Sequence, residues 1–164
     1  MTDKIVRPAA PALTRCPECG GKLVQASRPR TIAYRGRTRT YDQPGQWCDA
    51  CGEVYMNDDG TDVAARARVT LKAEVEGLLP PDEVRRIRQR LGLGLREAGR
   101  ILGGGEYAFR KYESGDIAVS EAMTNLLRLL DKNPAGLRTL CKAKGVAAAH
   151  ARKTTRGERH KRSA

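Results

Sequence analysis

Two short stretches of sequence, Cys16-Pro17-Glu18-Cys19-Gly20 and Cys48-Asp49-Ala50-Cys51-Gly52, decide how the N-terminal part of this chain folds. In each stretch two residues separate the cysteines, and this spacing lets both sulfurs converge on a single metal ion. The glycine after each second cysteine permits the tight backbone that follows. The 28 residues between Cys19 and Cys48 are enough for a small sheet, so a bound metal would close a hairpin-like loop and stabilise a subdomain with little core of its own.

The four cysteines Cys16, Cys19, Cys48 and Cys51 predict a closed zinc site with a structural role, because four thiolates leave no open position on the ion. Two other chemistries fit the same residues: iron in a rubredoxin-like site, and a pair of disulfides. The start of the chain argues against disulfides, since residues 1–12 include charged residues and prolines and no apolar signal peptide. We therefore expect a soluble, cytoplasmic protein with no membrane partner.

The basic character of the chain is concentrated at its two ends. The sequence has 31 Lys and Arg against 19 Asp and Glu, a formal net charge of +12. Residues 1–40 hold nine basic residues against two acidic ones, and residues 141–164 hold eight against one, whereas the middle is nearly neutral. Such an excess favours a polyanionic partner, most simply nucleic acid, although basic tails can also serve only to keep a protein soluble.

The patterns along the 164 residues favour two small domains of an α+β protein. Alternating β-branched, aromatic and basic residues between the cysteine pairs predict two or three short strands, with residues 34–37 at a hairpin tip. A helical pattern follows and ends at two prolines. We expect the following divisions: a flexible N-terminus over 1–13, a four-cysteine zinc-binding domain over 14–60, a linker helix over 61–81, a helix-turn-helix DNA-binding domain over 82–140 and a basic flexible tail over 141–164.

Two of the five short helices predicted within 82–140 have the spacing of a helix-turn-helix. A small residue at Gly99 would let the next helix cross closely, and the glycines at 103–105 supply the positive φ that a sharp turn requires. In the second of these helices Phe109 and Tyr112 are three residues apart and share an inward face. The side chains left outside on this predicted recognition helix can meet phosphates or base edges in a major groove; they are Tyr107, Arg110 and Lys111.

The helices on either side of this motif supply the predicted core. In the helix that opens the domain Val84, Ile87 and Leu91 would face inward, with the arginines at 85, 86, 88 and 90 outside. The leucines between 126 and 140 mostly close the core. Any surplus on their face would form a homodimer, which helix-turn-helix proteins commonly need to span two half-sites.

As a combination, these motifs are similar to those of the MqsA-type antitoxins. The resemblance covers roughly residues 14–140. The residues that carry it are the two cysteine pairs, the hairpin tip, Met56-Asn57, the Gly-Gly-Gly turn with Ala108-Phe109, Tyr112-Glu113-x-Gly115, and the leucine-rich segment 126–132. The resemblance implies a zinc domain that binds a small ribonuclease toxin, and a helical domain of the Xre/Cro type that dimerises and represses its own operon.

The resemblance also implies DNA-binding residues, and here the chain departs from the family pattern. Tyr107 and Lys111 stand where the best-known member has Asn and Arg as base-reading residues. Lys cannot make the fork of Arg, and Tyr cannot make the bidentate contact of Asn to adenine, so the operator sequence is expected to differ. Lys72 falls near a family arginine that contacts the DNA backbone.

Two readings other than an antitoxin fit these patterns. The first is a stand-alone zinc-containing transcriptional regulator with the same architecture. The second is a rubredoxin-like electron carrier fused to a DNA-binding module. The sequence holds no Ser/His/Asp set, no paired carboxylates in a cleft and no Cys/His dyad, so we expect no enzymatic activity.

Overall fold

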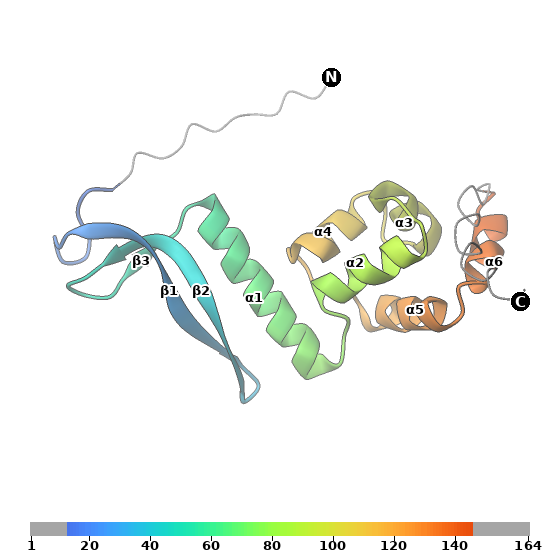
Figure 1. The fold of residues 1–164 in the computed structure, drawn as a ribbon, viewed down its shortest axis with the longest axis horizontal. Coiled ribbons are helices and arrows are strands. Elements are labelled where there is room, and N and C mark those ends of the chain that lie inside the picture. Colours follow the sequence, from blue (N-terminus) through green and yellow to red (C-terminus); the bar gives the residue numbers. More distant parts are fainter. Residues whose placement is uncertain (1–12, 146–164) are drawn as a thin grey trace, which may run out of the picture.

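The computed structural model describes residues 13–145, in which a three-stranded antiparallel sheet precedes six helices, as expected of an α+β protein (Figure 1). The predicted N-terminal segment and the tail lie outside the described residues, except for Leu13 and residues 141–145. No helix within the described part of the chain is both long and apolar enough to cross a membrane. The elements are β1 (Leu23–Tyr34), β2 (Arg37–Cys48), β3 (Val54–Tyr55), α1 (Asp58–Glu76), α2 (Pro81–Arg90), α3 (Leu95–Leu102), α4 (Ala108–Ser114), α5 (Glu121–Lys132) and α6 (Gly136–Ala143).

The first two strands form one long hairpin and not the short strands expected from the sequence. Each has 12 residues, and they pair without interruption from Leu23 opposite Cys48 to Tyr34 opposite Arg37. The two-residue turn at Arg35-Gly36 has φ values of 45° and 76°, which matches the twist of the strands. The predicted hairpin tip is therefore confirmed. Because the hairpin starts and ends beside the cysteine stretches, it brings them together.

Helix α1 begins earlier and ends earlier than the predicted linker helix. The side chain of Asn57 accepts a hydrogen bond from the backbone N–H of Gly60, which caps the helix at Asp58. Gly77 ends it with a φ of 67°, before the two prolines are reached. Pro81 instead opens α2, where a missing N–H costs nothing. The buried residues Ala64, Ala67 and Leu71 belong to α1, which packs against β1 and β2.

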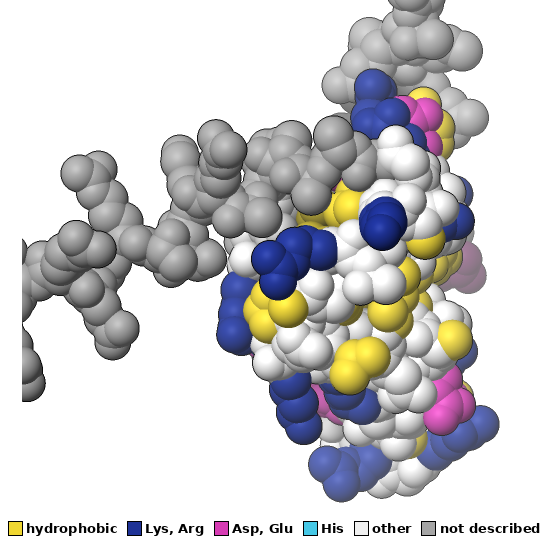
Figure 2. Space-filling view, turned by 90° about the vertical axis from the view of Figure 1, so that its right-hand side faces the viewer, with side chains coloured by type: hydrophobic (Ala, Val, Ile, Leu, Met, Phe, Trp, Pro, Cys, Tyr) yellow, Lys and Arg dark blue, Asp and Glu magenta, His cyan; other side chains and the backbone are white. Residues whose placement is uncertain are grey.

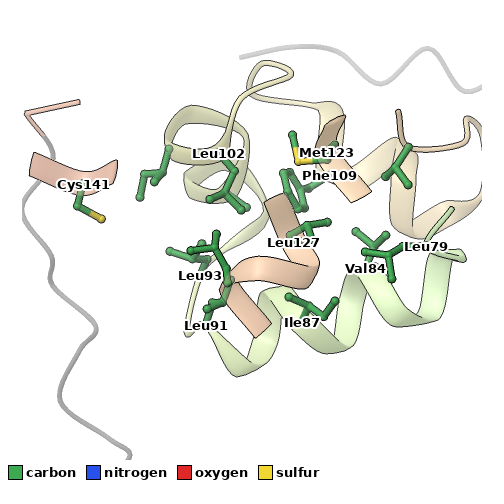
Figure 3. Packing of buried hydrophobic residues seen from close by; sticks show 14 residues of the cluster. Leu79, Val84, Ile87, Leu91, Leu93, Leu102, Phe109, Met123, Leu127 and Cys141 are labelled. Carbon is green, nitrogen blue, oxygen red and sulfur yellow. The ribbon is translucent and has the colours of Figure 1, made fainter. Parts of the chain in front are cut away.

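The five helices expected within 82–140 are present as α2 to α6, and they enclose the main hydrophobic core (Figure 3). Val84 and Ile87 of α2 are buried as predicted, against Phe109 of α4 and Leu127 of α5. Helix α6 runs to Ala143, so helical structure continues past residue 140. The buried core residues are Leu79, Val84, Ile87, Leu91, Leu93, Ala98, Ile101, Leu102, Phe109, Val119, Met123, Leu127, Leu130 and Cys141.

Arg66 of α1 joins the N-terminal part of the molecule to the helical part. Its guanidinium donates to the carbonyl oxygen of Glu113 at 2.8 Å and to the carboxylate of Asp82 at 2.5 Å. Gly115 lies so close to Arg66 that a Cβ at this glycine would be 2.9 Å from the Arg66 Cα. The long helix α1 therefore contacts both the hairpin and the end of α4.

Candidate metal centre and nucleic-acid interface

The four predicted metal ligands lie together at one end of the hairpin. The sulfurs of Cys16 and Cys51 are 3.6 Å apart and those of Cys19 and Cys48 are 3.4 Å apart, and all four lie within 4.8 Å of one another. A tetrahedral zinc ion with Zn–S bonds of about 2.3 Å spaces its sulfurs about 3.8 Å apart. The observed set of four thiols has the donor chemistry and the spacing of a closed tetrahedral metal site.

Both cysteine stretches adopt the same backbone turn. The N–H of Gly20 donates to the carbonyl oxygen of Cys16 at 2.8 Å, and the N–H of Gly52 donates to that of Cys48 at 2.9 Å. Both glycines have positive φ, 71° and 77°, which residues with a side chain rarely adopt. This is the role that the sequence predicted for a glycine after each second cysteine. Each turn contributes one buried and one exposed cysteine to the site.

The surroundings of the sulfurs favour thiolates at two of the four positions. The Tyr55 hydroxyl lies 3.5 Å from Cys16 Sγ, and this hydrogen bond lowers the pKa of Cys16 to about 6. The pKa of Cys48 is also lowered, first by a hydrogen bond from the backbone of Cys51. Metal coordination deprotonates thiols, and these hydrogen bonds favour the deprotonated form that a metal would bind. The ligand set suits zinc, and iron takes the same ligands.

The predicted helix-turn-helix is formed by α3, the glycine turn and α4. A Cβ at Gly99 would collide with the carbonyl oxygen of Gly105, so only glycine allows this approach. The turn itself passes through positive φ values of 107°, 88° and 90° at residues 103–105. Both features are the ones that the sequence predicted.

Helix α4 has the inward and outward faces expected of a recognition helix. Phe109 is fully buried and its ring meets that of Tyr112 edge-on, with centroids 5.6 Å apart. Tyr107 precedes the helix with 57% of its surface exposed, and Arg110 and Lys111 are also exposed. Within residues 13–145 neither Arg110 nor Lys111 forms an ion pair. Two cations on this short helix and a phenol immediately before it are therefore available to a ligand.

A buried ion pair that the sequence did not reveal fixes α4 in place. Arg88 was expected outside, but its side chain is only 12% exposed and its guanidinium meets the 4% exposed carboxylate of Glu113 at 2.5 and 2.9 Å. Arg88 also donates to the carbonyl oxygen of Leu93 at 2.7 Å. These contacts raise the pKa of Arg88, first through its hydrogen bond to Glu113. The sequence gives one indication of this ion pair, because Glu113 is the one acidic residue in α4.

Lys72 lies on α1, apart from the exposed residues of α4. It is exposed, with its Nζ 3.9 Å from a carboxylate oxygen of Glu76. An open hollow of about 620 Å³ separates the hairpin tip from the loop between α4 and α5, and Lys72 lines it together with Arg35, Tyr112 and Ser120. The structure thus gathers the four cysteines into one site, but places Lys72 on α1, apart from the other three predicted DNA-binding residues, which lie in or immediately before α4.

A four-cysteine hairpin joined by a long helix to a helix-turn-helix domain defines the class of this protein. The family of the antitoxin component of bacterial toxin-antitoxin systems, MqsA, matches residues 14–140. The Antitoxin MqsA of Escherichia coli (strain K12) is 32% identical over 123 residues, which cover 73% of this chain and 94% of that relative. The chain belongs to the MqsA antitoxin family.

Proposed function

We propose that this protein is the antitoxin of a type II toxin-antitoxin pair, which neutralises a small ribonuclease toxin through its zinc domain and represses its own operon. The observation that carries the proposal is the joining of a four-thiol site and a helix-turn-helix with exposed cations in one member of this family. The protein acts by binding in the cytoplasm and has no catalytic role.

The zinc-binding domain, residues 14–60, is the part that we assign to the toxin. Its buried apolar side chains before α1 are few: Cys16, Trp47, Cys48 and Val54. A structural zinc ion at the four cysteines would therefore maintain the shape of the toxin-binding surface. The segment 61–81 acts as the linker to the DNA-binding domain.

The helix-turn-helix domain, residues 82–140, is the part that we assign to the operator. Arg110 and Lys111 of α4 are exposed without ion-pair partners in the described chain, and Tyr107 is exposed just before the helix, so all three are free to contact a major groove. Lys72 contributes a backbone contact from α1. Leu129 of α5 is 63% exposed, and pairing of this face between two copies would give the dimer that spans two half-sites.

Two measurements test the two halves of the proposal. Affinity purification of the tagged protein from its native host should recover a small protein partner in stoichiometric amount, encoded beside the antitoxin gene. Fluorescence anisotropy should show that the protein prefers its own promoter to a random duplex. Recovery of the protein alone with retained promoter binding would support a stand-alone zinc-containing regulator, and failure of both measurements would reject both functions.

Lys111→Ala tests the assignment of the recognition helix. If Lys111 reads a base, the substitution should weaken promoter binding by roughly 1–3 kcal/mol and leave random-duplex binding almost unchanged. If it meets only phosphate, both duplexes should lose affinity equally. Lys22→Ala is the matched control, because this exposed lysine lies at the cysteine end of the hairpin, outside the helical domain. Equal affinities of parent and Lys111→Ala for every duplex would remove Lys111 from the interface.

A further inference from the structure

Arg66 connects α1 to the C-terminal end of α4 through several contacts at once. Its guanidinium donates to the carbonyl oxygens of Glu113 and Ser114, at 2.8 and 3.3 Å, and pairs with the carboxylate of Asp82 at 2.5 Å. The last carbonyl groups of a helix have no partner within the helix, and a cation at this end also meets the negative end of the helix dipole. A side chain of α1 therefore completes the end of the predicted recognition helix.

The backbone of α4 comes as close to α1 as atoms can pack. Gly115 ends α4 with a φ of 87°, and a Cβ at this glycine would lie 2.9 Å from the Cα of Arg66 and 3.0 Å from its Cβ. A second arginine, Arg128 of α5, donates to the carbonyl oxygen of Gly77 at 3.0 Å, where α1 ends. Helix α1 is thus held against the helical domain both in its middle and at its end, and Figure 1 shows it passing the end of α4.

Lys72 lies further along α1 and faces the same part of the helical domain. It lines the open hollow of about 620 Å³ together with Tyr112 of α4 and Ser120, the N-cap of α5. The place of Lys72 relative to α4 therefore depends on how α1 is held against that helix. Arg66 is an α1 side chain that holds it there, because its guanidinium bonds to the backbone of α4 itself.

We propose that Arg66 is a positioning residue for DNA binding: by fixing α1 to the end of α4, it holds Lys72 in the place from which both helices contact one duplex. This inference rests on the proposed function, which assigns Lys72 and the exposed cations of α4 to DNA. Groups that are already fixed in their bound arrangement lose less conformational freedom on binding, so the docked α1 raises the affinity for a duplex of any sequence.

Exposed positive charge alone does not single out Arg66. Figure 2 shows Lys and Arg side chains scattered over the end of the helical domain that is remote from the hairpin. Arg66 differs from an exposed cation because only 35% of its side chain is accessible and its guanidinium is bound by α4 and by Asp82 of α2. A phosphate contact would require the guanidinium to leave these partners, whereas a positioning role requires it to stay.

The test is a double-mutant cycle on the zinc-loaded full chain, with affinities for a random duplex measured by fluorescence anisotropy over a range of salt concentrations. In the parent, Lys72→Gln should reduce the slope of log K against log salt by about 0.9, the value for one phosphate contact. In the Arg66→Gln background the same change should alter slope and affinity much less, because Lys72 is no longer held in place. Additive losses would overturn the proposal, since Arg66 would then contribute to binding independently of Lys72.

Arg66→Lys separates the geometry of the guanidinium from its charge. Lysine keeps the charge but has no planar fork with which to reach two carbonyl oxygens and a carboxylate together. We therefore expect Arg66→Lys to bind like Arg66→Gln. Binding equal to that of the parent would assign Arg66 to a phosphate and overturn the proposal.

Arg68→Gln is the matched control for the cycle. Arg68 is an exposed arginine of the same helix, and it forms no ion pair within residues 13–145. In the Arg68→Gln background, Lys72→Gln should reduce the slope by its full amount. If the effect of Lys72→Gln were lost here too, removal of any α1 charge would explain the cycle, and the special role of Arg66 would be rejected.

Amide relaxation measured by NMR reports the docking of α1 without DNA. In the parent, the part that contains the hairpin and α1 should tumble with the same correlation time as the helical domain. In Arg66→Gln the two parts should have different and shorter correlation times, while dispersed amide signals show that both remain folded. A single unchanged correlation time in Arg66→Gln would overturn the proposal, because α1 would then be held without this residue.

Failure of the proposed function gives a different pattern of results. A parent that binds no duplex contradicts DNA binding as a whole, and the positioning role with it. A parent that binds DNA contradicts the positioning role alone if the cycle is additive, if Lys72→Gln leaves the slope unchanged, or if Arg66→Gln keeps one correlation time.

Discussion

At the scale of single residues, the carboxylate of Glu113 holds α4 against α2. Its side chain is 4% exposed and is paired with Arg88, which is itself 12% exposed. Removing one member of a buried pair leaves the other charge without compensation, which costs about 3–5 kcal/mol. We expect Glu113→Gln to lower the free energy of unfolding of the helical domain by about this amount, measured by urea denaturation.

Glu83→Gln is the control for this prediction. Glu83 pairs with Arg86 at 2.9 Å, but both side chains are more than two fifths exposed. Exposed pairs contribute about 0–1 kcal/mol, so this variant should unfold almost like the parent. If both variants lost a similar free energy of unfolding, burial of the Arg88–Glu113 pair would not contribute to the stability of the domain.

At the scale of elements, the helix-turn-helix depends on the close approach of α3 to the turn before α4. A Cβ at Gly99 would meet the backbone carbonyl of Gly105, and a backbone atom cannot swing aside as a side chain can. Overpacking of this kind costs about 1–3 kcal/mol, and more where the backbone must move. Gly99→Ala should therefore destabilise the domain by at least about 2 kcal/mol and weaken promoter binding, because α4 is displaced.

Gly94→Ala is the matched control for the Gly99 substitution. Gly94 has an ordinary φ of −71°, and a Cβ there would meet no atom within 4 Å. Because Gly94 is the N-cap of α3, where Gly is favoured over Ala, this variant should lose at most about 1 kcal/mol of stability and keep the DNA affinity of the parent. If Gly99→Ala behaved in the same way, the close approach would not be required for the motif.

The elements that could be predicted from the sequence are those whose signals are local. The cysteine turns, the hairpin tip at Arg35-Gly36 and the glycine turn each need a particular residue type at a fixed spacing. The full length of the hairpin was missed, because exposed Thr and Arg pairs carry little hydrophobic alternation. The start of α1 was also missed, because Asp58, Asp59 and Gly60 add no apolar side chain to the helical pattern and only the Asn57 cap marks the first turn.

The parts of the site that could not be predicted depend on pairing between distant residues. Arg88 and Glu113 are 25 positions apart, and no local pattern tells a buried arginine from its exposed neighbours at 85 and 86. The four cysteines are distant too, but the chemistry of a metal site prescribes how their two halves must combine. That is why the clustering of the four cysteines could be predicted from the sequence, whereas the partner of Glu113 could not.

At the scale of the whole molecule, the two halves differ in how much core they possess. Fourteen buried residues form the core of the helical domain, whereas the sheet before α1 buries only Cys16, Trp47, Cys48 and Val54 among its hydrophobic side chains. Structural zinc sites supply apparent binding free energies of about 10–16 kcal/mol, which appear as folding free energy. Removal of the metal should therefore unfold the N-terminal part and spare the helical domain.

Cys48→Ser tests this division without a chelator. The variant should lose its bound metal, become sensitive to trypsin before α1 and no longer retain the toxin, while its affinity for DNA falls much less. Cys141→Ala is the matched control, because Cys141 is buried in the helical core, apart from the four clustered cysteines. Cys141→Ala should keep one metal ion per chain, measured by colorimetric detection of the released metal. Its free energy of unfolding should fall only modestly. A Cys48→Ser protein that retained metal and resisted trypsin would show that the hairpin folds without the four-thiolate site.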